Sequence, residues 1–363
     1  MFIERGFNFI LEDGYHAMVT MESWMFLSSF EKLRADLLNN STILSMVHMP
    51  YLGKGGTSMG INFGTTATVV RKRRFDWYKG VYCYIRYFET DENGIPLEFP
   101  VKNERLSIAS ASDFKKIPGT PIAYWVSNRI REIFKNKYML DYATLFQGII
   151  TGDNNKFVRY WFELSRQKIA LHQKNISEID LSKSYWLPYN KGGERRKWYG
   201  NQEYVVNFRN GGKDFTRGKH QFSNFFLKPC FSWTYISSSS LATRYFPEGF
   251  LWDVHGSSVF PNEAENLYYF LALVSSPVGV YVLNVINPTI SYQVENVAAI
   301  PVVLPAQDVK ENISRIEKSK IDLAKTDWDS QEVSWDFAHF SLLRKESDYL
   351  TERLKSYCSP NRA

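Results

Sequence analysis

Cysteine and histidine are scarce in this sequence, and their spacing excludes the commonest metal and disulfide frameworks. The three cysteines, Cys83, Cys230 and Cys358, are odd in number and lie far apart along the chain, so they suggest neither paired disulfides nor a Cys-x-x-Cys zinc site. The six histidines include no His-Glu-x-x-His or His-x-His spacing, so no metal ligands are predicted. Free cysteines fit the reducing cytoplasm, which is the location we expect.

Long apolar runs are also missing, with one exception. Charged residues interrupt the first twenty positions, which excludes a signal peptide. Residues 266–294 carry no charge and are long enough to span a bilayer. However, Ser275, Ser276 and Pro277 divide this run, as a turn between two buried elements would. We therefore expect no membrane partner.

The composition is that of a folded protein with more aromatic residues than usual. The chain has 363 residues, of which 44% are hydrophobic, 23% charged and 16% aromatic, and this length favours two or three domains. So much ring surface exceeds the needs of a core, and we expect some of it to face a ligand. The net charge of +6 does not by itself indicate a nucleic-acid partner.

The first part of the chain has the pattern of an α/β sheet. Residues 14–21 are typical of a short buried strand, residues 23–40 of a helix, and residues 42–49 of a second strand. The β-branched residues of 62–72 predict a further strand that forms a hairpin on that sheet. These elements indicate the last strands of a doubly wound sheet. Its first strand and the glycine turn that binds a nucleotide are not in the sequence.

The rest of the chain changes character twice. We place the first boundary near residue 116, after which residues 117–305 alternate short aromatic strands with Gly-rich turns, as an irregular α+β domain does. Residues 306–363 contain two charged, periodic stretches that predict amphipathic helices. Residues 1–116, 117–305 and 306–363 are therefore the expected domains.

Positive charge is concentrated in residues 183–228. This segment has ten Lys and Arg residues against three acidic ones, a net charge of +7. Aromatic residues alternate with these charges, a combination that suits phosphate contacts and stacking on an unpaired base. The alternative is a solvated basic loop above aromatic residues of the core. We favour nucleic-acid binding, although clustered charge is an unspecific signal.

Two short motifs resemble catalytic signatures without matching them. Residues 52–60, LGKGGTSMG, fit neither the Gly-x-x-x-x-Gly-Lys-Ser/Thr nor the Gly-x-Gly-x-x-Gly pattern, and we expect a flexible loop. Asn287-Pro288-Thr289 lacks the second proline and the aromatic residue of the Asn-Pro-Pro-Tyr motif of amino-methyltransferases. We expect a turn there, and we assign no catalytic or cofactor-binding residue.

Six strings follow one another in the order found in a known family, and they occupy residues 20–34, 119–127, 148–163, 196–207, 231–261 and 330–337. Together they resemble the PglX-type adenine-specific DNA methyltransferases of BREX phage-defence systems, which are related to type IIG restriction-modification enzymes. The resemblance implies a downstream fragment, with the α/β tail of a doubly wound methyltransferase sheet, an irregular α+β target-recognition domain and C-terminal helices. In that family an upstream glycine motif binds S-adenosylmethionine, and Asn-Pro-Pro-Tyr binds the flipped adenine for methylation at N6. Neither motif is in this sequence.

The resemblance and the basic segment together identify double-stranded DNA as the expected partner. The predicted DNA-binding residues are Asn154, Asn155, Lys156, Arg159, Arg195, Arg196, Lys197, Trp198, Tyr199, Arg209, Lys213, Arg217, Lys219 and Arg244. The amides of Asn154, Asn155, Asn201 and Gln202 suit the major-groove edge of adenine, but capping of turns explains them equally well.

Two other functions remain open. The first is a non-catalytic specificity subunit that acts with a separate catalytic chain. The second is an aromatic-rich carbohydrate-binding protein, which the basic segment disfavours.

We expect this chain alone neither to bind S-adenosylmethionine with micromolar affinity nor to methylate DNA. The reason is that the first strand and the glycine turn of the cofactor-binding fold are not in the sequence. Isothermal titration calorimetry of the chain with the cofactor tests this expectation, and saturable binding heat would show it to be wrong.

Overall fold

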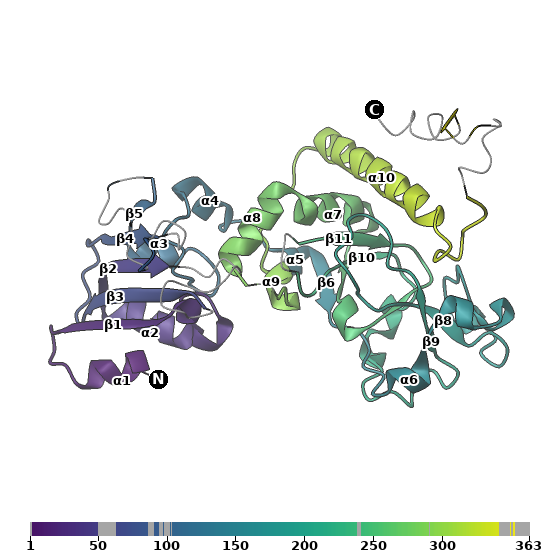
Figure 1. Cartoon of the computed structure of the whole chain (residues 1–363), viewed down its shortest axis with the longest axis horizontal. Coiled ribbons are helices and arrows are strands. Elements are labelled where there is room, and N and C mark those ends of the chain that lie inside the picture. Colours follow the sequence, from purple (N-terminus) through teal and green to yellow (C-terminus); the bar gives the residue numbers. More distant parts are fainter. Residues whose placement is uncertain are drawn as a thin grey trace. The chain divides into compact units, whose positions relative to one another are not determined.

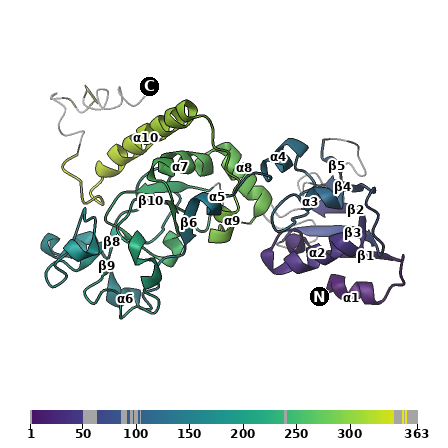
Figure 2. The same ribbon diagram turned by 180° about the vertical axis from the view of Figure 1, so that it is seen from behind.

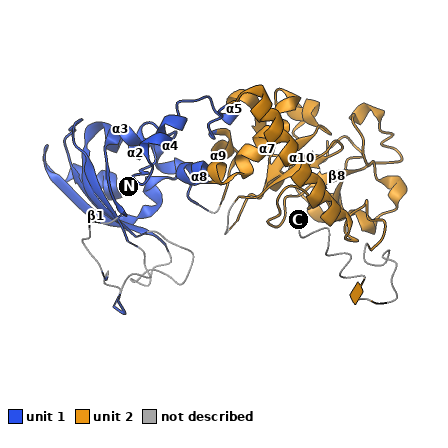
Figure 3. Ribbon diagram, turned by 90° about the horizontal axis from the view of Figure 1, so that it is seen from above, with its two compact units in different colours: residues 1–139, 281–289, 299–303 blue, residues 140–280, 290–298, 304–363 orange. Residues whose placement is uncertain are grey.

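A computed structural model divides the chain into two compact units, shown in blue and orange in Figure 3. Unit 1 comprises residues 1–139, 281–289 and 299–303, and unit 2 comprises residues 140–280, 290–298 and 304–363. The structure describes residues 2–49, 63–85, 91–93, 97, 102, 104–237, 241–289, 291–340, 349 and 351–352. The glycine-rich loop at residues 52–60, Cys358 and most of the second predicted C-terminal helix lie outside these ranges.

Unit 1 is built on a five-stranded mixed sheet, visible from both sides in Figures 1 and 2. The strand order is β1 (Tyr15–Met21), β3 (Thr65–Arg71), β2 (Thr42–Met49), β4 (Gly80–Tyr84) and β5 (Leu106–Ala109). β3 is antiparallel to both of its neighbours, β2 is parallel to β4, and β4 is antiparallel to β5. The predicted strand, helix and strand are confirmed, as is the hairpin of β2 and β3. In the sheet, β3 lies between β1 and β2.

One face of this sheet carries the core of unit 1. The helix predicted within residues 23–40 consists of two 3₁₀ turns and then α2 (Glu31–Asn40). Leu37 and Leu38 of α2 pack with Ile43 and Met46 of β2 and with Tyr82 of β4. Apolar residues at helical spacing on α2 therefore meet the alternate residues of the strands that point to the same side.

A buried arginine connects two of the strings that carry the family resemblance. Arg34 is 1% exposed, and it donates from Nη1 to the carbonyls of Trp24 and Leu27 at 3.0 and 2.6 Å. Its Nε and Nη2 donate to the carbonyl of Gly119 at 3.0 and 2.7 Å. Burial lowers the pKa of this guanidinium to about 10. The segments 20–34 and 119–127 are thus joined through one side chain.

The opposite face of the sheet is exposed and apolar. One row of paired residues crosses all five strands, through Ala17, Val69, Ser45, Val81 and Ile108. Ile108 is 63% exposed and Val81 is 39% exposed. Exposed patches of this kind on soluble proteins mark interaction surfaces.

Unit 2 contains two four-stranded sheets around an aromatic core. The first has the order β11 (Thr243–Phe246), β10 (Cys230–Trp233), β13 (Ser258–Pro261) and β6 (Ala143–Phe146). The second has the order β12 (Leu251–Trp252), β8 (Trp186–Asn190), β9 (Tyr204–Asn207) and β7 (Val158–Tyr160). Phe146, Phe226, Trp252 and Phe260 lie in one cluster. Much of the aromatic surplus is therefore core rather than ligand surface.

The remaining helices are mostly short. α10 (Gln307–Asp329) confirms the first predicted C-terminal helix, and it packs along α7 (Leu267–Ser275). No single described helix is long and apolar enough to cross a membrane, and residues 264–275 meet α8 (Pro277–Ile286) at a 70° bend. The other helices are α1 (Phe2–Asn8), α3 (Ala111–Phe114), α4 (Asn128–Ile133), α5 (Met139–Tyr142), α6 (Asn154–Phe157) and α9 (Val294–Ala298).

The two turns predicted from serine, proline and asparagine are present. Ser276 interrupts the path from α7 to α8, and its Oγ accepts from the backbone N–H of Gly279 at 3.0 Å. After α8, the side chain of Asn287 accepts from the backbone N–H and the hydroxyl of Thr289 at 3.2 and 2.8 Å. Asn287-Pro288-Thr289 is therefore a turn, as expected from its sequence.

A substitution in the core on the covered side of the unit 1 sheet and one on its open side are expected to differ in their effect on stability. Leu38→Ala removes a side chain that is 1% exposed and should lower the free energy of unfolding by about 2–5 kcal/mol. Val19→Thr changes a side chain that is 63% exposed and should change it by no more than about 0.5 kcal/mol. Urea unfolding of both variants measures the difference. Equal effects would contradict the assignment of a covered and an open face.

Candidate nucleic-acid interface

The predicted DNA-binding residues all lie in unit 2, but they differ in exposure. Seven are exposed: Asn154, Asn155, Lys156, Arg195, Arg209, Lys213 and Arg217. Five are half-buried: Arg159, Arg196, Lys197, Trp198 and Lys219. Tyr199 and Arg244 are buried. The exposed and half-buried residues can contact a partner, and the contacts within unit 2 determine how they are oriented.

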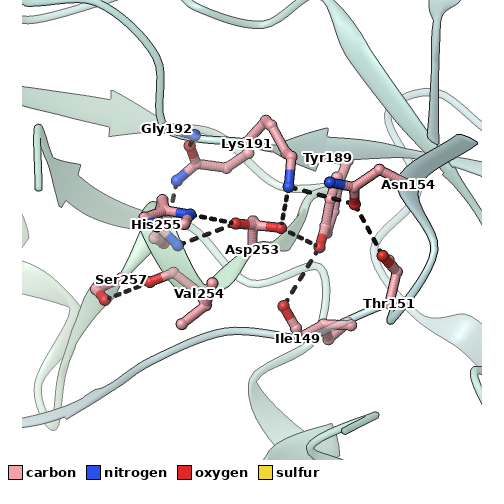
Figure 4. A network of polar contacts seen from close by, with 12 residues as sticks. Ile149, Thr151, Asn154, Tyr189, Lys191, Gly192, Asp253, Val254, His255 and Ser257 are labelled. Carbon is pink, nitrogen blue, oxygen red and sulfur yellow. Dashed lines mark hydrogen bonds and ion pairs between the residues drawn. The ribbon is translucent and has the colours of Figure 1, made fainter. Parts of the chain in front are cut away.

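A buried carboxylate orders the centre of this surface. Asp253 follows β12 and is 2% exposed. Its Oδ2 accepts from the hydroxyl of Tyr189 at 2.9 Å and from Nζ of Lys191 at 2.5 Å. Its Oδ1 accepts from the backbone N–H of His255 at 3.0 Å and contacts Nδ1 of the same residue at 3.2 Å. Figure 4 shows these contacts, which with Thr151 and Asn154 we call the Asp253 network.

Asn154 joins this network through its amide oxygen. The oxygen accepts from the hydroxyl of Thr151 at 2.8 Å and from Nζ of Lys191 at 3.4 Å. An ammonium can only donate, so the partner of Lys191 must be the oxygen of the amide. The NH₂ group of exposed Asn154 is then left to donate to a ligand. It suits an acceptor such as a purine N7 or a phosphate oxygen.

The turn before Asn154 is packed tightly against a basic segment. Gly152 has φ +84°, and a Cβ at this position would lie 2.1 Å from Oγ1 of Thr216. The backbones of Ile150 and Arg217 exchange two hydrogen bonds at 3.0 and 2.9 Å. At the next residue, Asp153 caps α6 by accepting from the N–H of Lys156 at 3.1 Å. Asn154, Lys156 and Arg217 are thereby carried on adjacent segments.

The amide of Asn201 has a structural role, whereas that of Gln202 is buried. Nδ2 of Asn201 donates to the carbonyls of Gly192 and Glu194 at 3.1 and 2.8 Å, so turn capping, the alternative expected from the sequence, describes Asn201. Gln202 is 1% exposed, and its Nε2 has no hydrogen-bond partner among the described residues. Asn154 and Asn155 remain the exposed amide candidates for base contacts.

Arg244 does not occupy the position that a phosphate contact requires, because it is 0% exposed. Its Nη1 donates to the carbonyl of Arg196 at 3.0 Å and to Oγ1 of Thr234 at 2.8 Å. Burial, followed by the charge of Arg196, lowers the pKa of this guanidinium to about 10. Nε and Nη2 have no hydrogen-bond partner among the described residues. Arg244 therefore supports, from the interior, the loop of residues 195–197, which we call the basic loop. It does not line the surface.

Helix α10 packs against the other side of the same loop. The guanidinium of Arg196 lies 4.9 Å from the ring of Trp328, and the ammonium of Lys325 lies 5.4 Å from the ring of Tyr199. Burial raises the pKa of Tyr199 to about 12. Gly200 permits this packing, since a Cβ there would lie 2.3 Å from the side chain of Arg196. Tyr199 is a core residue, whereas half-buried Trp198 remains partly accessible.

Of the Asp253 network, Asn154 was among the predicted DNA-binding residues, whereas Thr151, Tyr189, Asp253 and His255 were not. Lys191 was counted in the basic segment without being assigned a role. A single acidic residue within the apolar run FLWDV is the signal that could have identified Asp253, because a carboxylate among buried neighbours must be paired. The sequence does not show which donors would reach it.

Sequence comparisons agree with the resemblance noted above. The chain is 33% identical over 371 residues to "Adenine-specific methyltransferase BrxX" of Escherichia coli O9:H4 (strain HS), an alignment that covers 99% of this chain. It is 32% identical over 370 residues to "Adenine-specific methyltransferase PglX" of Lacticaseibacillus casei (strain Zhang), covering 96% of this chain. By sequence, the chain is related to the PglX-type adenine-specific methyltransferases. It spans 29% and 30% of the lengths of these two relatives.

A family model and a solved structure show two further similarities, the first in sequence and the second in fold. The model of the Eco57I restriction-modification methylase matches residues 1–53, which include β1, α2 and β2. Among solved structures, a nuclease-deletion mutant of the Type ISP restriction-modification enzyme LlaGI in complex with a DNA substrate mimic has a TM-score of 0.50 at 10% identity. The similarity covers 87% of this chain and 36% of that one, and it concerns the fold.

The position of Arg244 predicts that this PglX relative depends on it for stability. Arg244→Met keeps an unbranched side chain but removes the guanidinium, so the carbonyl of Arg196 and the hydroxyl of Thr234 lose this donor. We expect the free energy of unfolding to fall by about 1–3 kcal/mol. The control Lys213→Met changes an exposed cation and should have an effect below about 0.5 kcal/mol. Guanidinium unfolding followed by tryptophan fluorescence compares them, and an unchanged Arg244→Met would refute the supporting role.

Proposed function

We propose that this chain is the target-recognition part of an S-adenosylmethionine-dependent, adenine-specific (N6) DNA methyltransferase of a phage-defence or restriction-modification system. In this proposal residues 1–116 are the C-terminal part of the catalytic domain, residues 117–305 are the DNA target-recognition domain, and residues 306–363 are the helical C-terminal segment. The part of the recognition domain that lies in unit 2 binds duplex DNA. Homology to the BrxX and PglX methyltransferases over nearly the whole chain supports the family assignment.

The observation that carries DNA binding is positive charge without matching negative charge within one segment of unit 2, residues 183–228. Of the ten cations in residues 183–228, Lys183, Lys191 and Arg196 are in ion pairs with acidic residues. Six others are in no ion pair with a described carboxylate: Lys197, Arg209, Lys213, Arg217, Lys219 and Lys228. Cations that the protein itself does not neutralise suit a phosphate backbone, where binding releases condensed counterions.

Several cations of the surface are also held in fixed orientations. The guanidinium of Arg209 lies 3.7 Å from the ring of Tyr185, and the Asp253 network fixes Lys191 beside Asn154. Fixed donors lose less side-chain entropy on binding than flexible ones. The relative solved with a DNA substrate mimic, which shares the fold, is consistent with this role.

Methyl transfer would require residues outside this sequence. S-adenosylmethionine supplies the methyl group, and the target base must leave the helical stack to reach it. Correct placement of two reactants accounts for about 7–11 kcal/mol of a reaction barrier, and no residue of this chain is assigned to that placement. The role of unit 2 is to bind and orient the duplex, so we propose that the chain is inactive alone.

The exposed face of the unit 1 sheet favours a second candidate, a specificity subunit that acts with a separate catalytic chain. The apolar row that ends at Ile108 would be covered by such a partner. An adjacent reading frame that encodes the glycine motif and Asn-Pro-Pro-Tyr would favour this candidate. A single longer reading frame with both motifs would favour the first.

Charge reversal of the basic loop tests the proposed function. Replacing Arg195, Arg196 and Lys197 together with Glu should weaken binding to duplexes of every sequence. It should also flatten the dependence of log K on log salt by up to about 3 × 0.9, if all three side chains contact phosphates. Fluorescence anisotropy with a labelled duplex, at several salt concentrations, measures both quantities.

A matched control separates local contacts from net charge. Replacing Lys32, Lys115 and Lys135 of unit 1 with Glu gives the same net charge, because each triple reversal takes the formal charge from +6 to zero. This control should retain most of the affinity and the full salt dependence. If both variants bind as the unmodified chain does, or lose binding equally, the basic loop is not the DNA-binding surface.

A further inference from the structure

We propose that His255 is a further DNA contact of this surface, with its imidazolium donating from Nε2 to a phosphate oxygen, and that Asp253 is its positioning residue. This inference rests on the proposed function and deepens it. Asp253 is buried with a side chain that is 3% exposed, whereas the side chain of His255 is 59% exposed. A buried anion therefore holds one edge of an imidazole whose other edge is accessible.

The contacts of Asp253 determine which nitrogen of the imidazole is free. Nδ1 of His255 lies 3.2 Å from Oδ1 of Asp253. Because a carboxylate accepts and does not donate, Nδ1 carries the hydrogen of this bond. Nε2 is then an acceptor in the neutral ring and a donor in the imidazolium. Only the imidazolium can donate from Nε2 to a phosphate.

The backbone around His255 restricts where the ring can point. A Cβ at Gly192 would lie 2.8 Å from the carbonyl oxygen of His255, and a Cβ at Gly256 would lie 2.3 Å from that of Asn190. Two glycines thus allow two loops to approach closely. The ring of Tyr235 packs edge-on against the imidazole, with centroids 5.6 Å apart. The imidazole is oriented before any ligand binds, as a selective contact requires.

The charges that face His255 define the sign of a pH dependence. Asp253 is its charged neighbour in the network, and it is also paired with Lys191 at 2.5 Å. Tyr189 and Tyr235 are the other titratable groups that pack here. With a neutral imidazole, the charges of Asp253 and Lys191 cancel, and protonation of His255 adds one positive charge. A bound phosphate stabilises that charge, so the protein with a protonated His255 should bind the duplex more tightly.

The pH dependence of the salt effect tests this inference in the full chain. We would measure binding to a random-sequence duplex at pH 6 and pH 8 over a range of salt concentrations. For the unmodified chain, the slope of log K against log salt should be steeper at pH 6 by about 0.9, the value for one phosphate contact. With equal affinities at 1 M salt, this difference in slope corresponds to an affinity about eightfold higher at pH 6 than at pH 8 in 0.1 M salt.

Three single variants and one double variant assign the pH-dependent part of the slope to particular residues. His255→Gln should remove the pH-dependent part of the slope, and its thermal melting should be close to that of the unmodified chain because the side chain is exposed. His172→Gln is the control, since His172 is also exposed and lies 3.8 Å from a carboxylate, that of Asp336. It should retain the pH dependence. Asp253→Asn should lose the same pH-dependent part, and adding His255→Gln to it should cause no further loss.

The outcomes distinguish a failure of the proposed function from a failure of the inference about His255. If the unmodified chain binds no duplex, both the proposed function and this inference are wrong. If it binds, and His255→Gln retains the full pH-dependent slope, only the inference is wrong. If affinity instead falls at pH 6 and His255→Gln abolishes that fall, Nε2 accepts from a base amino group and the phosphate contact is refuted.

Discussion

The proposed DNA-binding surface depends on one buried carboxylate. Asp253 has almost no exposure and would be costly to bury without donors. Three side chains and one backbone amide satisfy it, and they come from β8, the loop that follows it and the turn after β12. Lys191 extends the network to Asn154. The orientation of Lys191, Asn154 and His255 is thus a consequence of neutralising Asp253.

A buried arginine performs the same task in each unit. Arg34 joins the carbonyls of Trp24, Leu27 and Gly119 in unit 1, and Arg244 donates to the carbonyl of Arg196 in unit 2. Each guanidinium replaces water at carbonyl groups of irregular backbone, which secondary structure leaves without donors. The loops gain order from a cation inside the fold. The exposed cations of the same segments remain for a partner.

Local pattern was enough to predict the first elements of unit 1, because β1, α2 and β2 follow their own hydrophobic periodicity. Local pattern was not enough to distinguish the buried from the exposed basic and aromatic residues of unit 2. Arg244 and Tyr199 are residue types expected in a DNA-binding segment, but both are buried. Their burial depends on strands and helices that are distant in sequence. Asp253 and Lys191 are 62 positions apart, so their pairing could not be read from spacing.

Hydrogen–deuterium exchange of the full chain with and without duplex DNA tests the central claim most directly. The account predicts that DNA slows exchange in residues 151–156, 190–197, 209–217 and 253–257 of unit 2. Exchange of the backbone amides in the strands of the unit 1 sheet should not change. Protection confined to unit 1, or binding that leaves these four segments of unit 2 unprotected, would contradict the account.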